Sequence, residues 1–169
     1  MTGRVLVDIQ GTQSIDHRDR GVARYIIDLA TALHERHGQR VGPFLLTPDR
    51  TPPGGIEPFV AAGALASIDE VEPRAGDVYH VASPYELTVP LRRHWPPAVR
   101  DAGARLAVTL YDVIPEVFAD RYLTDPGLRR RYRARHHLVR QADAVLAISQ
   151  ATADDAVDRL GLDPAKVTV

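Results

Sequence analysis

The chain lacks cysteine altogether in its 169 residues. A disulfide framework, a thiolate nucleophile and a cysteine-based zinc site are therefore excluded, and the composition agrees with a reducing compartment. Long apolar runs are missing too, because no segment approaches the roughly 18–20 consecutive apolar residues that a membrane-spanning helix needs. The apolar run near the N-terminus, Val5-Leu6-Val7, is too short for a secretory signal. We therefore expect a cytoplasmic protein.

The chain also lacks an excess of charge and the common nucleotide-binding and metal-binding motifs. Its 21 basic and 22 acidic residues give a net charge of -1, so bulk electrostatics give no reason to expect nucleic acid as a partner. G-x-G-x-x-G and G-x-x-x-x-G-K-[ST] are absent, which disfavours a dehydrogenase or a P-loop ATPase. No Asp-x-Asp occurs, and the pairs His34 with His37 and His136 with His137 have no carboxylates at ligand spacing. We expect solvated surface histidines, no metal site and no cofactor.

Short aliphatic segments alternate with amphipathic ones along the whole chain. The aliphatic segments are apolar throughout, as strands buried on both faces are. Strands are expected at residues 4–9, 40–47, 65–68, 77–82, 105–110, 144–148 and 166–169, and helices at 21–38, 56–62, 126–142 and 152–160. An irregular strand start at Gly42-Pro43, a loop at 48–55 and broken helical turns at 84–103 follow from proline and glycine. This alternation indicates one α/β domain, a doubly wound, mainly parallel, Rossmann-like sheet with helices on both faces.

Ligands of open α/β sheets bind beyond the carboxyl ends of the strands, so the residues that follow each strand are the candidate site. The polar residues in such positions are Asp8, Gln13, His80, Ser83, Glu86, Tyr111, Asp112 and Ser149. His80 is suited to donate to a ligand hydroxyl or to titrate near neutrality, with a structural histidine as the alternative. Asp112 either accepts from ligand hydroxyls or starts an Asx-turn. Ser149 is expected to cap the helix that follows it.

Gly21 is expected at the N-terminus of the first long helix. Free backbone N–H groups and the helix dipole favour an anion there, and the missing Cβ lets it come close. Arg20 and Arg24 flank this glycine and would add positive charge. The alternative is an ordinary cap or turn glycine.

The helix expected at 126–142 is basic, with six arginines and no acidic residue between Gly127 and Ala142. One stripe is formed by Arg129, Arg133, His136 and Arg140, with Arg130 and His137 beside it. Such a face meets an anionic membrane surface or a lipid-phosphate acceptor, or is merely solvated. The first possibility would place the protein peripherally at the inner membrane face.

Several segments, taken together and in order, form a recognisable series. They are Val5-Leu6-Val7-Asp8 with Gly11 and Gln13, Arg20-Gly21-Val22-Ala23-Arg24-Tyr25, His80-Val81-Ala82-Ser83-Pro84-Tyr85-Glu86, Tyr111-Asp112-Val113-Ile114-Pro115 with Arg121-Tyr122-Leu123, Ala142 to Ser149, and Asp163 to Val169. This series resembles the N-terminal half of glycosyltransferase family four enzymes, which have the GT-B architecture. The likeness covers nearly the whole chain.

The resemblance implies a role for each candidate residue. Donor phosphate or sugar binding falls to Arg20, Gly21, Val22 and Arg24, acceptor binding to Asp8, Gln13, His80, Ser83 and Glu86, and catalysis to Tyr111 and Asp112. The family usually has His-Asp where this chain has Tyr111-Asp112, and a tyrosine donates a hydrogen bond without titrating near pH 7. Residues 1–169 would be the acceptor-side domain, and a C-terminal domain outside this chain would hold most of the nucleotide-sugar. The final strand ends with the chain, which agrees with a longer polypeptide.

The activity that the resemblance implies is retaining, metal-independent transfer of a mannose-like or rhamnose-like hexose. The donor would be a nucleotide-sugar, and the acceptor a hydroxyl, such as one on a lipid-linked glycan, in glycan or surface polysaccharide synthesis. The alternative is a non-catalytic Rossmann-like binding module that acts through a partner chain.

Overall fold

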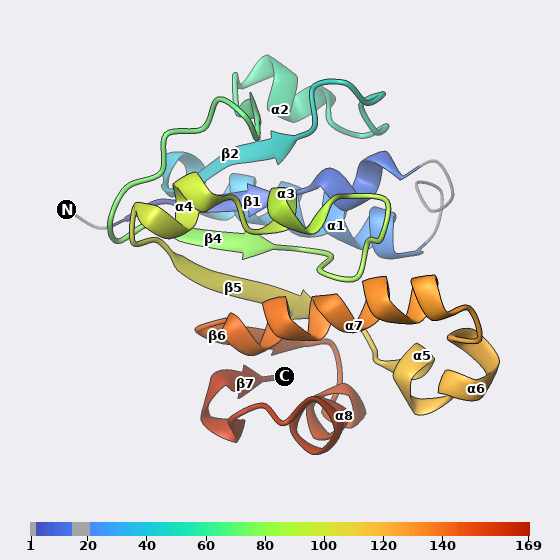
Figure 1. Cartoon of the computed structure of the whole chain (residues 1–169). Coiled ribbons are helices and arrows are strands. Elements are labelled where there is room, and N and C mark those ends of the chain that lie inside the picture. Colours follow the sequence, from blue (N-terminus) through green and yellow to red (C-terminus); the bar gives the residue numbers. More distant parts are fainter. Residues whose placement is uncertain (1–2, 15–20) are drawn as a thin grey trace.

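The computed structural model describes residues 3–14 and 21–169. Its centre is one sheet of seven parallel strands in the order β3-β2-β1-β4-β5-β6-β7 (Figure 1). The strands are β1 (Val5–Asp8), β2 (Val41–Leu46), β3 (Leu65–Ser67), β4 (Val78–Val81), β5 (Arg105–Leu110), β6 (Ala144–Ala147) and β7 (Val167–Thr168). The α-helices are α1 (Gly21–His37), α2 (Glu57–Ala61), α3 (Leu91–His94), α4 (Pro97–Asp101), α5 (Ile114–Val117), α6 (Ala119–Tyr122), α7 (Pro126–Gln141) and α8 (Gln150–Leu160). The doubly wound α/β fold expected from the sequence is confirmed.

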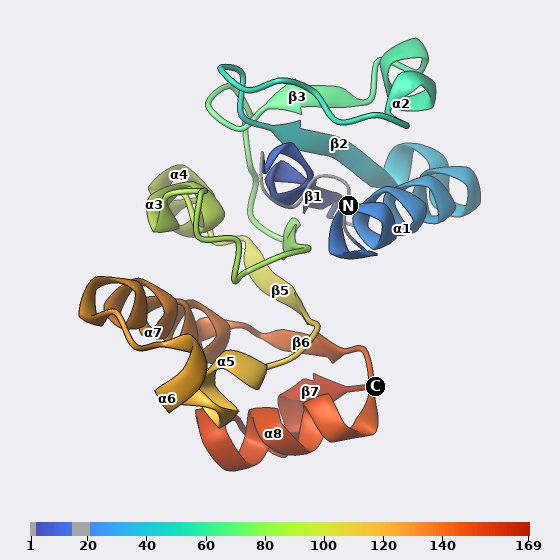
Figure 2. The same ribbon diagram turned by 90° about the vertical axis from the view of Figure 1, so that its right-hand side faces the viewer.

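The direction in which the chain crosses the sheet reverses once. From β1 the chain moves outward to β2 and β3, returns to pair β4 with β1, and then moves outward on the other side to β5, β6 and β7. The carboxyl ends of β1 and β4 therefore flank a topological switch point, where α/β proteins bind their ligands. Figure 2 looks onto this carboxyl edge of the sheet.

Helices cover both faces of the sheet (Figure 2). On one face, Ile26 of α1 and Phe59 of α2 join Val7 of β1 in a buried cluster. On the opposite face, Val139 of α7 joins Leu6 of β1, and side chains of α4 and α8 complete that cluster. Successive residues of a strand point to opposite faces, so both Leu6 and Val7 are buried. This two-sided burial explains why the strands are apolar throughout.

The elements follow the sequence-based expectations except between β5 and α7. Two four-residue helices, α5 and α6, occupy a stretch for which no element was expected. A single turn is too short to show an apolar period, so pattern analysis has nothing to detect. Ser149 caps α8 as expected, because its Oγ accepts the N–H of Thr152 at 3.2 Å.

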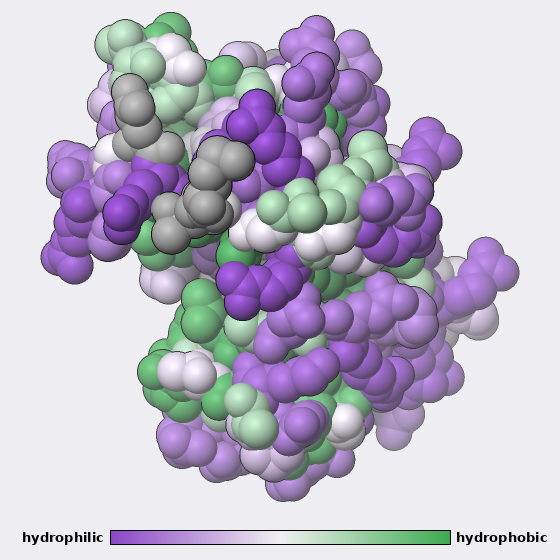
Figure 3. Space-filling view, turned by 90° about the vertical axis from the view of Figure 1, so that its left-hand side faces the viewer, coloured by the Kyte–Doolittle hydropathy of each residue, from purple (hydrophilic) through white to green (hydrophobic). Residues whose placement is uncertain are grey.

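The opposite edge of the sheet, where the strands begin, has a largely hydrophilic surface (Figure 3).

The irregular start expected for β2 is confirmed, since the β1–β2 register shifts between Val5 and Val7. Gly42 has a φ of +119°, a conformation that glycine adopts without the strain a Cβ would cause.

Candidate functional site

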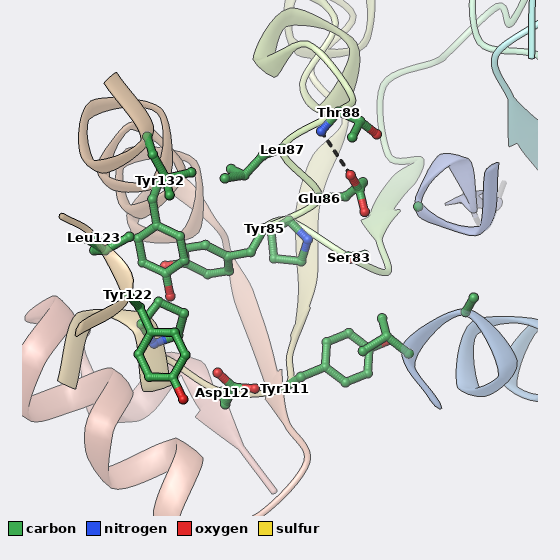
Figure 4. Close-up of a pocket in the computed structure, with 16 residues that line it drawn as sticks. Ser83, Tyr85, Glu86, Leu87, Thr88, Tyr111, Asp112, Tyr122, Leu123 and Tyr132 are labelled. Atoms are coloured by element: carbon green, nitrogen blue, oxygen red, sulfur yellow. Dashed lines mark hydrogen bonds between the residues drawn. The ribbon is translucent and has the colours of Figure 1, made fainter. Parts of the chain in front are cut away.

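A cleft of about 520 Å³ opens at the carboxyl edge of the sheet (Figure 4). Its walls come from the 3-10 helix Gln10–Gln13 after β1, the start of α1, the loop after β4, the segment after β5, and helices α6 and α7. The lining residues are Gly11, Val22, Ala23, Ser83, Pro84, Tyr85, Glu86, Leu87, Thr88, Tyr111, Asp112, Pro115, Tyr122, Leu123, Leu128 and Tyr132. The volume lies within the ~300–1,000 Å³ of small-molecule sites, and the position is the one that the topology favours.

One wall of the cleft is aromatic. Tyr85 packs against Tyr132 of α7 with ring centroids 4.7 Å apart, and both rings contact His136, at 5.7 and 5.4 Å. Figure 4 shows Tyr122 and Leu123 on the same side of the cleft. Burial raises the pKa of the Tyr85 and Tyr132 hydroxyls well above its ordinary value. This wall therefore presents apolar rings and neutral hydroxyls.

Other parts of the lining are polar. Ser83, Glu86 and Thr88 come from the loop after β4, where the N–H of Thr88 donates to Glu86 Oε1 at 2.9 Å (Figure 4). Asp112 follows β5, and its Oδ1 accepts the N–H of Ile114 at 2.9 Å. Asp112 thus forms the Asx-turn and also lines the cleft with an exposed side chain. Carboxylates of this kind accept hydrogen bonds from ligand hydroxyls.

Tyr111 reaches from the end of β5 toward α1 (Figure 4). Its ring meets that of Tyr25 edge to face at 5.4 Å, and its carbonyl accepts the Thr152 hydroxyl at 2.9 Å. The Tyr111 hydroxyl has no hydrogen-bond partner among the described residues, and burial, followed by the nearby Tyr25, raises its pKa. Tyr111 is therefore suited to donate a hydrogen bond to a ligand, but not to exchange a proton near pH 7.

Asp8 and Gln13 lie beneath the cleft and do not line it. Asp8 is 2% exposed, and its Oδ1 accepts the N–H of Gln10 at 2.8 Å. The Gln13 amide makes two bonds with the backbone of Thr47, accepting its N–H at 2.8 Å and donating to its carbonyl at 3.0 Å. Both side chains tie the end of β1 to its surroundings, so any contribution to acceptor binding is indirect.

Three histidines differ from what their sequence positions indicated. His80 is buried with Nε2 2.9 Å from the Thr109 hydroxyl, and burial lowers its pKa to about 4, so the possibility that it titrates near neutrality is wrong. His136 was expected at the surface but is 5% exposed, because it lies on the inward side of α7. His34 is partly buried, and its ring packs edge-on against Phe59 at 5.8 Å.

Two buried basic residues that sequence analysis did not single out hold the loop after β4. His94 places Nδ1 3.1 Å from Asp8 Oδ2 and Nε2 3.2 Å from the carbonyl of Glu86. Arg135 of α7 donates through Nη2 to the carbonyls of Glu86, at 3.3 Å, and Val89. Burial lowers the pKa of Arg135 to about 10, which leaves it charged. His94 lies in a proline-rich stretch and Arg135 in an arginine-rich helix, so neither stood out in the sequence.

The start of α1 lies at the edge of the cleft. Gly21 is exposed, and a Cβ there would meet no atom of residues 3–14 or 22–169 within 4 Å. Val22 lines the cleft, but Arg24 lines a separate cavity of about 340 Å³ together with residues 53–55. Arg20 lies outside the described residues. The structure thus brings Val22 together with the strand-end residues and separates Arg24 from them.

The basic stripe on α7 is bonded to neighbouring parts of the fold. The bonds run from Arg129 Nε to the carbonyl of Leu123 at 2.7 Å, from Arg133 to the carboxylate of Glu116 at 2.7 Å, and from Arg140 Nε to the carbonyl of Leu160 at 2.7 Å. The hydrogen bond from Arg133 lowers the pKa of Glu116. His136 is buried and does not belong to the exposed stripe, contrary to expectation.

Two statements hold for the part of the chain that the structure describes. No three histidine, aspartate or glutamate side chains there converge as the ligands of a metal ion do. No helix there combines the length and the apolar character needed to cross a bilayer.

Comparison with known proteins adds to this geometry. The family model described as Glycosyltransferase Family 4 matches residues 20–169. The match includes the start of α1, the loop after β4, the segment after β5, and helices α6 and α7, which are the parts that line most of the cleft. No curated protein matches the chain. The matched range covers most of the chain, and the parallel seven-stranded sheet agrees with the GT-B architecture of that family. The chain therefore belongs to glycosyltransferase family 4.

Proposed function

We propose that this chain is the acceptor-binding half of a retaining, metal-independent glycosyltransferase. In this proposal the enzyme moves a mannose-like or rhamnose-like hexose from a nucleotide-sugar to a hydroxyl acceptor, such as a lipid-linked glycan, in glycan or surface polysaccharide synthesis. A C-terminal domain outside these 169 residues would hold most of the nucleotide-sugar. The observation that carries the proposal is the cleft at the β1–β4 switch point of a family 4 chain.

The lining of the cleft suits a saccharide acceptor. A sugar ring has apolar C–H faces and hydroxyl edges, and the cleft offers the rings of Tyr85 and Tyr132 beside the polar groups of Ser83 and Glu86. Aromatic faces pack against the apolar side of a ligand, while carboxylates and hydroxyls fix its orientation. The accepting hydroxyl would lie near Asp112, whose carboxylate can accept its hydrogen bond.

The donor side of the site would be the start of α1. This helix is 17 residues long, and the free N–H groups of its first turn, at Gly21 and Val22, favour the diphosphate of a nucleotide-sugar. Arg24 is exposed and follows Ala23, which lines the cleft. It lines the adjoining cavity, from which it would add positive charge. Arg20 is also predicted to bind the donor phosphate or sugar.

In the transfer step the bond between the sugar's anomeric carbon and the diphosphate would break as a bond to the acceptor oxygen forms, and negative charge would develop on the departing diphosphate, which would take up the acceptor's proton. The N-terminus of α1 would stabilise that charge, and the neutral Tyr111 hydroxyl would donate a hydrogen bond to the donor or the transferred sugar. Because burial raises the pKa of Tyr111, this role is electrostatic and involves no proton transfer by its side chain.

Transfer can be tested with defined substrates. The polypeptide that contains this chain is incubated with GDP-mannose or dTDP-rhamnose and with octyl α-mannoside or octyl α-rhamnoside, and products are detected by mass spectrometry. We expect the mass of one acceptor to rise by one sugar residue. Asp112→Asn and Glu86→Gln should lower the rate by about tenfold or more, whereas Asp158→Asn, at an exposed position on α8, should not. Equal rates for all variants would contradict the assignment of the cleft.

One observation favours the alternative, a non-catalytic module that acts through a partner chain. Tyr111 stands where the family pattern usually has histidine, and its buried hydroxyl does not titrate near neutral pH. Octyl glycosides that bind the cleft without being extended from either donor would support this alternative over transfer.

Peripheral contact with the inner membrane face through Arg129, Arg133 and Arg140 stays a prediction. Arg133 is paired with the Glu116 carboxylate, which reduces its charge at a lipid surface, whereas Arg129 and Arg140 donate to neutral carbonyls and keep their charge. Sedimentation with phosphatidylglycerol vesicles tests the contact. Replacement of the three arginines by glutamine should weaken it, and Arg36→Gln, at the exposed end of α1, is the control.

A further inference from the structure

We propose that His94 is a positioning residue, carried as an imidazolium ion, that sets the wall of the cleft formed by residues 83–89. It acts through a buried network with Asp8 and Arg135. The protonation state follows from the hydrogen-bond partners of His94, while the effect on acceptor binding rests on the proposed function.

The hydrogen-bond partners of His94 determine where its protons are. Nε2 lies 3.2 Å from the carbonyl oxygen of Glu86, which only accepts, so Nε2 carries a hydrogen. Nδ1 lies 3.1 Å from Asp8 Oδ2. The other oxygen of Asp8 accepts the N–H of Gln10 at 2.8 Å, as an ionised carboxylate does. Beside an ionised Asp8, which only accepts, Nδ1 carries a hydrogen too, and a ring protonated on both nitrogens is a cation.

The surrounding charges balance this cation. Asp8 and Glu86 bring two negative charges, and Arg135 with His94 brings two positive ones, all on side chains that are 6% exposed or less. With a neutral ring beside an ionised Asp8, the group would hold an uncompensated buried negative charge, which is costly in a low dielectric. The other titratable side chains that interact with Asp8 are those of Tyr79 and His80, which burial keeps neutral.

The network joins β1, α3 and α7 to the backbone of the loop. His94 and Arg135 both donate to the carbonyl of Glu86, and Arg135 also donates to that of Val89. Between these two anchors lie the side chain of Glu86 and the N–H of Thr88, which bond to each other and line the cleft. Loss of His94 removes one charge-assisted bond from the Glu86 carbonyl and leaves Asp8 buried without its cation.

Two variants separate the hydrogen bonds from the charge. In Asp8→Asn the new amide can donate to Nδ1 of a neutral ring, so Nε2–H stays on Glu86 and the loop keeps its place. In His94→Gln a single amide NH2 has to serve two acceptors that lie on opposite sides of the original ring, so one bond is lost. His37→Gln, at the exposed C-terminal end of α1, is the matched control.

Nitrogen NMR of the histidine rings near neutral pH reads the protonation state directly. We expect both ring nitrogens of His94 to be protonated in the unmodified protein, and one to lose its proton in Asp8→Asn. A neutral ring in the unmodified protein would overturn the imidazolium assignment, and this measurement does not depend on whether His94→Gln folds.

Backbone NMR and kinetics test whether His94 positions the loop after β4. His94→Gln should shift the amide signals of Glu86 to Val89 and raise the KM for octyl α-mannoside about tenfold, with kcat changed less than about twofold. Asp8→Asn should keep the loop signals, and the His37→Gln control should keep both the loop signals and the KM. Unshifted loop signals in His94→Gln, or shifted signals with an unchanged KM, would overturn the positioning role. Absence of any transfer by the unmodified protein counts against the proposed function. The ring and amide signals still show whether His94 is protonated on both nitrogens and whether it holds the loop.

Discussion

Gly11 and Ser83 approach each other closely at the switch point, and Gly11→Ala tests how tightly this part of the cleft is packed. A Cβ on Gly11 would lie 2.9 Å from the Cβ of Ser83 and 3.3 Å from its hydroxyl oxygen. Normal contact between carbon atoms is ~3.5–4.0 Å, so the loop after β4 has to retreat by more than about half an ångström. Overpacking of this kind should lower the free energy of unfolding by about 1–3 kcal/mol.

Gly21→Ala is the matched control, because a Cβ there meets no atom of the described residues within 4 Å and Gly21 is the first residue of α1. This variant should change the free energy of unfolding by less than about 1 kcal/mol. Urea denaturation followed by circular dichroism measures both changes, and each kcal/mol corresponds to about 2–4 °C in Tm for a domain of this size. A Gly11→Ala protein as stable as the unmodified one would show that the wall of the cleft yields freely, and would refute the packing argument.

Three further changes test other parts of the structure. His80 has its pKa lowered by burial from 6.5 to about 4, so the unfolded chain takes up a proton first as the pH falls. The stability that the neutral ring contributes is present above pH 6.5 and is lost toward pH 4, by at most about 1.4 kcal/mol per pH unit. His80→Gln should flatten this dependence of the free energy of unfolding on pH, measured by urea denaturation at several pH values. The same dependence in His80→Gln and the unmodified protein would contradict the argument. Phe59→Ala removes a fully buried ring whose centroid lies 4.5 Å from that of Phe44. The variant should lower the free energy of unfolding, measured by urea denaturation, by about 3–5 kcal/mol. A loss below about 1 kcal/mol would mean that the surrounding side chains close the cavity. Tyr111→Phe removes a hydroxyl that has no hydrogen-bond partner among the described residues, so Tm should change little. Transfer to octyl α-mannoside should fall about tenfold, and unchanged transfer would remove Tyr111 from the mechanism.

Parts of the site could be predicted because they depend on chain order alone. Ser83, Tyr111 and Asp112 come within two residues of a strand end and Glu86 lies in the same loop as Ser83, and in a parallel sheet such positions meet at one edge. Asp8 is the last residue of β1 at that edge, yet its side chain is buried and does not line the cleft. A strand-end rule gives the edge on which a residue lies, but not the direction in which its side chain points.

The residues that support the cleft could not be predicted in the same way. His94 is separated from Asp8 by 86 positions in the chain, and Arg135 is separated from Glu86 by 49. Their burial depends on how α3 and α7 pack against the loop after β4, and short-range periodicity carries no signal of that packing. His136 shows the same limit, because its spacing from Arg133 and Arg140 placed it on the basic stripe, whereas the packing of α7 buries it.

The sequence by itself determined the alternation of strands and helices, the two-sided burial of the sheet and the edge of the sheet at which the cleft opens. These properties follow from local hydrophobic patterns and from the fixed handedness of β-α-β connections. Only the tertiary structure decided which polar side chains face the cleft, which histidines are buried, and how His94 and Arg135 hold the loop after β4. Those outcomes depend on contacts between distant segments, where burial determines both the protonation state and the hydrogen-bond partners of each group.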